Sequence, residues 1–168
     1  MTTPTDSYRF LDFFSRRLAK AWIAREPQRE IPWTPLEKPL SECTVAMISS
    51  GGIALRTDAP FDQEGERRNP WWGDPSFRVI PKHATENDIE IYHLHIDPSF
   101  GREDLNCLLP LRRLEELEGT GEVGGAAPRH YSFMGYILDP TDLLEKSTPA
   151  IIRHLKNDQV DLVLLVPT

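Results

Sequence analysis

The sequence predicts an α/β fold, a mostly parallel sheet flanked by helices, and two adjacent segments carry this prediction. Residues 160–166 are an almost unbroken aliphatic run between Asp158 and Pro167, which is typical of a strand buried on both faces of a parallel sheet. Residues 148–157 precede this run and have the pattern of a helix. A helix followed by an apolar strand is a unit of an α/β fold, in which ligands bind beyond the carboxyl ends of the strands.

Residues 1–42 are expected to form an N-terminal helix and a proline-rich connector, separate from an α/β domain at residues 43–168. Thr5 or Asp6 can cap a helix that runs to about Arg25, and apolar residues recur along it at helical spacing. Its apolar face predicts that this helix docks on another surface. The prolines that follow favour an extended connector: Pro27, Pro32, Pro35 and Pro39.

The α/β domain begins with a predicted strand at residues 44–49, which ends at Ser50-Gly51-Gly52. Two glycines after a buried strand allow a positive φ angle or a close approach of the backbone to another group. The pattern suits a site for an anionic ligand and also an ordinary tight turn, and both alternatives stay open.

The middle of the domain is predicted as a loop followed by a strand. Residues 58–81 are rich in proline, glycine and charged side chains, and long ordered loops of this kind are often functional. Residues 89–97 are predicted as a strand whose alternation places His93 and His95 on the same face.

Helical segments are predicted between this strand and the last one. The first spans residues 110–118, because Pro110 suits a first helical turn and Gly119 suits a C-terminal cap. A further segment opens at residues 139–140, and Pro149 restarts or kinks it.

Composition excludes several classes of protein. The 168 residues include 39% hydrophobic and 27% charged residues, as in a globular domain. A net charge of −7 without a basic block argues against nucleic acid and membrane surfaces as partners. With no visible signal peptide or membrane span, a cytoplasmic location is expected. Cys43 and Cys107 are too few for a disulfide framework and are interpreted as buried, inert thiols.

Two histidines supply donor types that bind metals. His93 and His95, together with Asp97, Asp104 or His130, have the chemistry of a metal site. The alternative is a pair of partly buried histidines bonded to backbone or carboxylate groups. The spacing alone is a weak signal, and no metal is expected.

Residues 129–135 form the densest polar and aromatic cluster. Arg129 has a side chain that can grip a carboxylate with two hydrogen bonds, and His130 can move a proton near neutral pH. A structural ion pair with core packing is the alternative.

Several ordered segments resemble the selenoprotein B family of amino-acid reductases, which contains the selenocysteine subunit of D-proline reductase and component B of the glycine, sarcosine and betaine reductases. The most specific of them is the string Pro-Arg-His-Tyr-Ser-Phe-Met-Gly at residues 128–135. The resemblance runs from about Thr44 to Thr168. The segments that carry it are residues 44–52, 58–62, 73–81, 110–114, 127–135 and 160–168, with His95 and Asn106.

The resemblance implies reductive cleavage of a C–N bond in a small amino acid or amine. In the family, a strand like residues 160–166 leads into a motif of selenocysteine or cysteine followed by a second cysteine. That motif is absent here, and selenocysteine is encoded by the stop codon UGA. We therefore expect an in-frame UGA after Thr168, a domain that lacks its C-terminal part, and an inactive 168-residue chain. A true terminus in a non-catalytic member is the alternative.

The resemblance also implies partners and roles. A partner reductase subunit with a pyruvoyl group activates the amine, and a thiol redox protein supplies electrons. Arg129 is expected to hold the substrate carboxylate, His130 to protonate the leaving amine, and Gly51 and Gly52 to let the first strand approach the selenium. These residues are expected to lie together near Val166.

Other readings stay open. The chain can be a non-catalytic binding or assembly subunit that uses residues 58–81 as its contact surface, or a metal-dependent hydrolase built on His93 and His95. A strand left uncovered around Leu162, Leu164 and Val166 would favour self-association, so a homo-oligomer is a further alternative.

Overall fold

The computed structural model describes residues 8–9, 11–25, 34–69 and 72–168. The chain divides into two compact units, Met1–Pro35 and Leu36–Thr168. The first unit contains helix α1 (Phe13–Ile23), which begins after Asp12, whose side chain accepts hydrogen bonds from two backbone N–H groups of the first turn. The helix ends two residues before the predicted Arg25. The predicted caps Thr5 and Asp6 lie outside the described residues.

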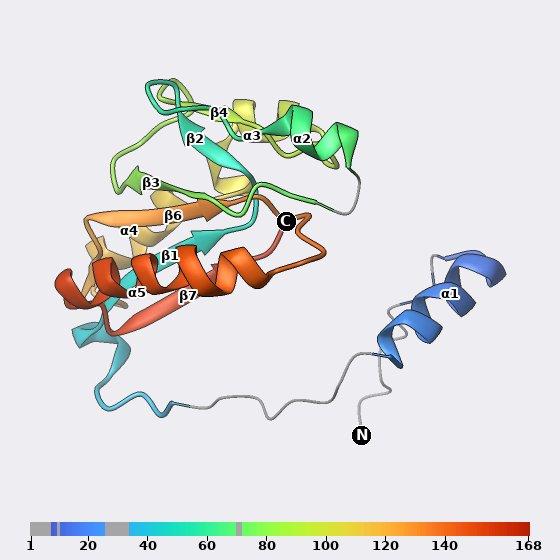
Figure 1. Cartoon of the computed structure of the whole chain (residues 1–168). Coiled ribbons are helices and arrows are strands. Elements are labelled where there is room, and N and C mark those ends of the chain that lie inside the picture. Colours follow the sequence, from blue (N-terminus) through green and yellow to red (C-terminus); the bar gives the residue numbers. More distant parts are fainter. Residues whose placement is uncertain (1–7, 10, 26–33, 70–71) are drawn as a thin grey trace. The chain divides into compact units, whose positions relative to one another are not determined.

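The second unit alternates strands and helices (Figure 1). Its elements are β1 (Thr44–Ser49), β2 (Ile53–Leu55), α2 (Gln63–Arg68), β3 (Phe77–Pro81), β4 (Ile89–Ile91), α3 (Pro98–Glu103), α4 (Leu111–Gly119), β5 (Gly125–Ala126), β6 (Arg129–Phe133), α5 (Thr148–Asn157) and β7 (Leu162–Val166). A π-helical turn (Leu143–Ser147) runs directly into α5, at the point where Pro149 was predicted to interrupt the helix.

The main sheet is built around β1. Strand β7 runs parallel to β1 along its length, from the pair Val45–Leu162 to the pair Ser49–Val166. The opposite edge of β1 pairs with two strands that run parallel to it, β5 at its start and β6 at its end. Strand β3 pairs antiparallel with β6. Strands β2 and β4 form a separate antiparallel pair. The sheet is thus mixed and mostly parallel, which confirms the predicted fold class.

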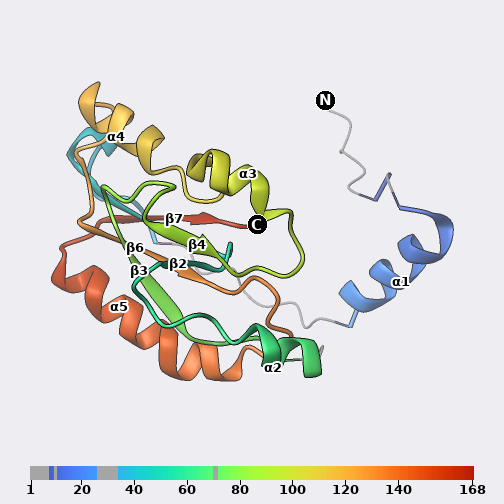
Figure 2. The ribbon, with the colours of Figure 1, turned by 90° about the horizontal axis from the view of Figure 1, so that it is seen from above.

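The sheet lies between two layers of helices (Figure 2). Helix α5 lies against one face, where the rings of Phe77, Tyr131 and His154 are in contact. Helices α3 and α4 lie on the opposite face. Most of the buried core is on that side, including Val45, Met47, Ile80, Leu109 and Leu114. Among the described helices, none combines the length and the apolar character needed to cross a membrane.

Several predicted boundaries are confirmed and others are wrong. Strand β1 and helix α5 match the prediction, and α4 differs from its predicted range by one residue at each end. The predicted loop at residues 58–81 contains α2 and β3, so it is not a loop throughout. The strand predicted at residues 89–97 ends at Ile91, and the chain turns at Leu94 and His95.

Strand β7 was predicted to be buried on both faces, and this is wrong. It is an edge strand of the sheet, with β1 as its neighbour. Leu162 and Val166 pack against the core, whereas Val163, Leu164 and Leu165 are 37%, 47% and 68% exposed. The uncovered apolar surface that the sequence predicted here therefore lies at the middle of the strand and not at Leu162 and Val166.

Candidate functional site

The turn after β1 requires glycine at Gly52. The φ angle of this residue is +61°, a conformation that side chains with a Cβ rarely adopt. A Cβ atom at Gly52 would also lie 2.7 Å from the Met134 sulfur and 2.9 Å from the backbone nitrogen of His93. The predicted need for a positive φ angle or a close backbone approach is therefore confirmed, and both occur at this residue.

The amide groups of the same turn are used inside the protein. Gly51 donates its N–H to Ser49 Oγ at 3.0 Å, and Gly52 donates its N–H to the Phe133 carbonyl at 3.0 Å. An anionic ligand would have to displace these hydrogen bonds. The geometry thus favours the tight turn over the anion site that the glycine pair also allowed.

Strand β7 ends beside this turn. Ser50 donates its N–H to the Val166 carbonyl at 3.1 Å, and Thr168 donates its N–H to Ser50 Oγ at 2.8 Å. Thr168 consequently lies at the carboxyl edge of the parallel strands. This is the edge at which α/β folds bind their ligands.

Polar and aromatic side chains from separate segments gather near this edge, and we call them the carboxyl-edge cluster: Ser50, Glu66, His93, His95 and Tyr136. The Nδ1 atom of His93 accepts the backbone N–H of His95 at 3.1 Å, so the proton of the neutral ring is on Nε2. A Cβ atom on Gly135 would lie 2.6 Å from His93 Nε2 and 2.8 Å from the Ser50 carbonyl. The absence of a side chain at Gly135 therefore keeps this nitrogen and the β1 turn close together.

The protonation of His93 follows from its surroundings. Burial lowers the pKa of the ring, and the neighbouring His95 lowers it further. His93 is therefore neutral near pH 7 and offers one N–H donor, at Nε2.

Glu66 is the buried member of the cluster and is paired with His95. It is 3% exposed, and its Oε1 atom lies 3.0 Å from His95 Nε2, while its Oε2 atom is buried without a hydrogen-bond partner. Burial raises the pKa of Glu66, and the hydrogen bond to His95 opposes this effect. The His95 side chain is 51% exposed and its ring centroid lies 4.4 Å from that of Tyr136. In this pair, the buried carboxyl group of Glu66 thus lies within hydrogen-bond distance of an imidazole that is exposed to solvent.

Glu66 is held in place because helix α2, on which it lies, is fixed by a cap and by contacts with residues outside the helix. Asp62 caps the helix by accepting the Gly65 N–H at 2.8 Å. Gln63 donates from its side chain to the Tyr92 carbonyl at 2.6 Å, and the Trp72 ring leaves no room for a Cβ atom on Gly65. A six-residue helix is marginal alone, so these contacts fix the position of Glu66.

The predicted further ligands of a metal site lie elsewhere. Asp97 accepts the Ser99 N–H at the start of α3, Asp104 accepts the Asn106 N–H, and His130 is buried between β1 and β3. In the described part of the chain, no three His, Cys, Asp or Glu side chains are grouped to hold a metal ion. The geometry therefore gives no support to a metal-dependent hydrolase.

Arg129 is engaged in a two-pronged ion pair with Asp158. Its Nε lies 2.8 Å from Oδ2 and its Nη2 lies 2.7 Å from Oδ1 of that carboxylate, which lowers the pKa of Asp158. Arg129 begins β6 and Asp158 follows α5, so the pair lies at the amino end of the parallel strands. The expectation that Arg129 lies beside Gly51 and Val166 is therefore wrong. Its role in holding a substrate carboxylate stays a prediction, for which the guanidinium would have to leave Asp158.

His130 is fully buried and faces the core. Its Nδ1 accepts the Met47 N–H at 3.0 Å, and its Nε2 is buried without a hydrogen-bond partner. Burial lowers its pKa to about 4, so the ring is neutral at pH 7. Its predicted role as the proton donor to an amine stays a prediction, for which the core would have to open.

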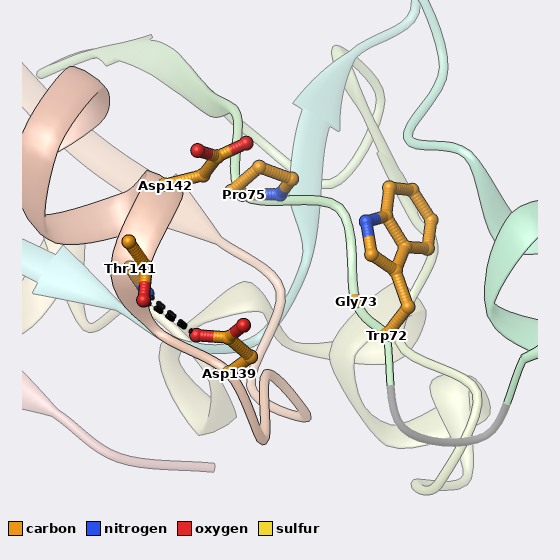
Figure 3. Close-up of a pocket in the computed structure, with 6 residues that line it drawn as sticks. All are labelled: Trp72, Gly73, Pro75, Asp139, Thr141 and Asp142. Carbon is orange, nitrogen blue, oxygen red and sulfur yellow. Dashed lines mark hydrogen bonds between the residues drawn. The ribbon is translucent and has the colours of Figure 1, made fainter.

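A surface cavity of about 260 Å³ lies between the segment at Trp72–Pro75 and the segment at Asp139–Asp142 (Figure 3). It is lined by Trp72, Gly73, Pro75, Asp139, Thr141 and Asp142. A Cβ atom on Gly73 would meet the Tyr136 carbonyl, which places the cavity next to the cluster. Asp139 already accepts the Thr141 N–H and hydroxyl, and Asp142 pairs with Lys146 at 2.9 Å. Both carboxylates are therefore engaged by their own segment.

The two cysteines differ in exposure. Cys43 is buried, as predicted, and its thiol donates to the Pro39 carbonyl at 3.3 Å. Cys107 is exposed, so the interpretation of Cys107 as buried is wrong. The apolar neighbours Leu108 and Leu109 point inward, but the short helical turn at Leu105–Cys107 turns the cysteine outward.

Sequence reasoning missed Glu66 and Tyr136. Glu66 lies among exposed charged residues in a segment that has no apolar periodicity, so its burial has no local signal. Tyr136 belongs to the cluster only because the Met134–Gly51 bridge brings its segment to β1.

Comparison with known proteins adds an independent observation. The family model of the glycine/sarcosine/betaine reductase selenoprotein B (GRDB) matches residues 23–168. The chain is also similar to the D-proline reductase subunit gamma of Acetoanaerobium sticklandii, at 35% identity over 133 residues, which are 79% of this chain and 52% of that protein. No solved structure matches the chain.

More distant relatives have related names. The glycine reductase complex component B subunit gamma of Carboxydothermus hydrogenoformans is 29% identical over 138 residues, which are 82% of this chain and 31% of that protein. The betaine reductase complex component B subunit beta of Peptoclostridium acidaminophilum is 26% identical over 132 residues, which are 78% of this chain and 29% of that protein. The chain thus spans about half the length of the first relative and about a third of the other two.

Proposed function

The chain belongs to the glycine/sarcosine/betaine reductase selenoprotein B family, and from this premise we propose that it is part of a subunit that cleaves a C–N bond of a small amino acid or amine by reduction. The observation that carries the proposal is the family match over residues 23–168. The geometry supports it, because the end of β7 and the carboxyl-edge cluster meet at the ligand-binding edge of the sheet.

The proposal assigns the redox nucleophile to residues that follow Thr168 in the complete protein. Selenocysteine or cysteine there supplies a low-pKa nucleophile for carbon, and a nearby cysteine allows its regeneration. The edge fits a negatively charged neighbour, since His93 offers its Nε2–H close to Ser50 and Gly135. The chain's own contribution is to hold this edge and its proton donors in place.

The proposed partners are those of a multi-subunit reductase in the cytoplasm. The relatives carry names of subunits and of complex components. On the family premise, a partner subunit with a pyruvoyl group activates the substrate amine, and a thiol redox protein delivers the electrons. No metal or nucleic acid is part of the proposal.

Genomic DNA tests the first step of the proposal. We expect an in-frame UGA codon after Thr168, then a cysteine within a few codons and an amphipathic helix. A UAA or UAG codon there, or no open frame beyond it, would contradict the assignment of the nucleophile.

Turnover tests the activity itself. With a dithiol, the 168-residue chain is expected neither to release an amine from glycine, sarcosine or betaine nor to open the ring of D-proline, because covalent catalysis needs the nucleophile. The full-length product with its partner subunit is expected to cleave the C–N bond of one of them, detected as a released amine or, for D-proline, as the ring-opened amino acid. Assembly with that subunit without turnover would favour a non-catalytic assembly subunit instead, and turnover by the 168-residue chain would show that the chemistry has been misplaced.

A further inference from the structure

Glu66 has an environment that a purely structural carboxylate rarely has. It is 3% exposed, one of its oxygens faces His95 Nε2 at 3.0 Å, and the other is sealed from solvent without a partner. An unsatisfied buried polar atom costs stability, so such a group is retained where it serves another purpose.

The geometry of His95 complements this carboxyl group. Its Nε2 is tied to Glu66, and its ring is steadied by contact with the Tyr136 ring. Half of the side chain is exposed, and no described residue forms a hydrogen bond with Nδ1. A carboxylate on one ring nitrogen fixes the tautomer and leaves the other nitrogen to exchange protons with a ligand.

The location favours a role in the proposed reaction. His95 donates its backbone N–H to His93, whose ring lies against Gly135 and the β1 turn, where Thr168 is hydrogen-bonded to Ser50. The pair thus belongs to the edge at which the proposed substrate would bind. The buried His130, by contrast, lies within the core.

We propose that His95 is the proton-transferring residue of this site and that Glu66 is its positioning residue. As the selenolate or thiolate that the proposed function places after Thr168 bonds to carbon, the C–N bond breaks and its electron pair passes to nitrogen, which takes the Nδ1 proton of the doubly protonated His95 ring. The ring is left neutral with its remaining proton on Nε2. Thiolates of the dithiol donor then release the product from selenium or sulfur and supply the two electrons of the reduction, becoming a disulfide. This inference rests on the proposed function.

Other ionisable groups surround the pair and define the controls. Arg67 on α2 lowers the pKa of Glu66, the His93 ring lies edge-on to the His95 ring at 5.9 Å between centroids, and the Tyr136 ring contacts His95 in a tilted arrangement. Glu64 is on the same helix as Glu66 but is exposed and pairs with Arg68. Replacing Glu64 therefore changes the charge of α2 without touching the pair.

Nitrogen NMR of the 168-residue chain tests the geometry without any turnover. The neutral form of His95 is expected to be the Nε2–H tautomer in the wild type and in Glu64→Gln, and a mixture of tautomers in Glu66→Ala. An Nδ1–H tautomer in the wild type would overturn the proposal. Because Glu66 is buried, Glu66→Gln, which keeps the side-chain volume but removes the carboxylate, provides the second variant if Glu66→Ala does not fold, and it is also expected to give a mixture of His95 tautomers.

Turnover of the full-length protein with its partner subunit tests the chemistry. His95→Ala is expected to lower kcat by about 10²- to 10⁴-fold with partial rescue by added imidazole, and Glu66→Gln by about tenfold with an altered pH profile. Glu64→Gln should match the wild type. Full activity of His95→Ala would overturn the inference alone. An inactive wild type would overturn the proposed function and the catalytic step with it. In that case the tautomer of His95, measured by NMR, would still show whether the Glu66–His95 pair forms.

Discussion

Among the described glycines, Gly52 alone combines a positive φ angle with close neighbouring atoms, since Gly121 has a φ angle of +73° but no atom within 4 Å of its Cβ position. The φ angle of Gly52 is +61° and a Cβ atom would meet Met134 and His93, whereas a Cβ atom on Gly119 at the end of α4 would have nothing within 4 Å. We expect Gly52→Ala to lower the free energy of unfolding by roughly 1–3 kcal/mol. Gly119→Ala should leave it unchanged or raise it by up to about 1 kcal/mol. Urea unfolding measures both, and equal losses in the two variants would contradict this account of the turn.

His130 links stability to pH. A histidine takes up its proton near pH 6.5 in the unfolded chain, but at about 4 in the folded protein, because it is buried. Between these values the unfolded chain binds more protons, so the free energy of unfolding should fall as the pH drops from 6.5 to 4, by up to about 3 kcal/mol. Above pH 6.5 the contribution is fully present.

The variant His130→Gln isolates this contribution. It keeps a hydrogen-bond acceptor for Met47 but cannot titrate, so its loss of stability between pH 7.5 and 4 should be smaller than that of the wild type. His83→Gln on the surface is the matched control and should follow the wild type. Parallel pH profiles of His130→Gln and the wild type would show that His130 is not the group responsible.

Single residues were predictable from the sequence where the constraint is local. The glycine turn follows from the end of a buried strand, and a local pattern also identifies Cys43 as buried. The partners of Arg129 and His95 depend on residues 29 positions away in each case, Asp158 and Glu66. No local pattern reveals such pairs. The sequence therefore identified the residue types, whereas their partners could be found only from the fold.

At the scale of elements, β7 exposes apolar side chains along an edge of the sheet. Exposed apolar edge strands favour association between copies of a chain. Leu165→Lys is therefore expected to reduce self-association in sedimentation velocity, and to change the free energy of unfolding by less than about 0.5 kcal/mol, because Leu165 is 68% exposed. Leu117→Lys on α4 is the control and should leave association unchanged. A wild-type chain that stays monomeric at high concentration would contradict the prediction.

Elements with strong internal patterns were predictable, and elements held by distant contacts were not. Strand β1 and helix α5 each carry their own apolar pattern and appear where predicted. Strand β6 contains Arg129, His130 and Ser132, whose side chains form hydrogen bonds with Asp158, Met47 and Ile53. Strand β3 forms because β6 is its partner. Both strands form through pairing with distant parts of the chain, so neither is clearly predicted by its own residues.

At the scale of the whole molecule, the core formed by the described residues lies within the Leu36–Thr168 unit. Helix α1 has no buried residue, and the described core residues all follow residue 42. Removing residues 1–35 should thus change the free energy of unfolding, followed by circular dichroism, by less than about 0.5 kcal/mol. The core variant Ile80→Ala should lower it by about 2–5 kcal/mol. A truncated chain that loses as much as Ile80→Ala would show that the first unit stabilises the second.

The fold class was predictable from two neighbouring segments, but the layout of the sheet was not. The helix and strand at residues 148–166 indicate a parallel sheet, and the sheet is mostly parallel. The order of its strands depends on β7 returning to β1, and on β5 and β6 sharing the other edge of β1. Hydrophobic periodicity describes each strand separately and says nothing of its neighbours.

Because β1 pairs with β7, the main sheet cannot be completed on the ribosome until β7 has been synthesised. The hydrogen bond between Thr44 and Asp161 joins residues 117 positions apart. At synthesis rates of about 5–20 residues per second, β1 waits on the order of 10 seconds for this neighbour. During that time one edge of its backbone has no strand partner, whereas the strands for its other edge are synthesised before β7. A nascent chain in this state is a natural client for chaperones that bind extended apolar segments.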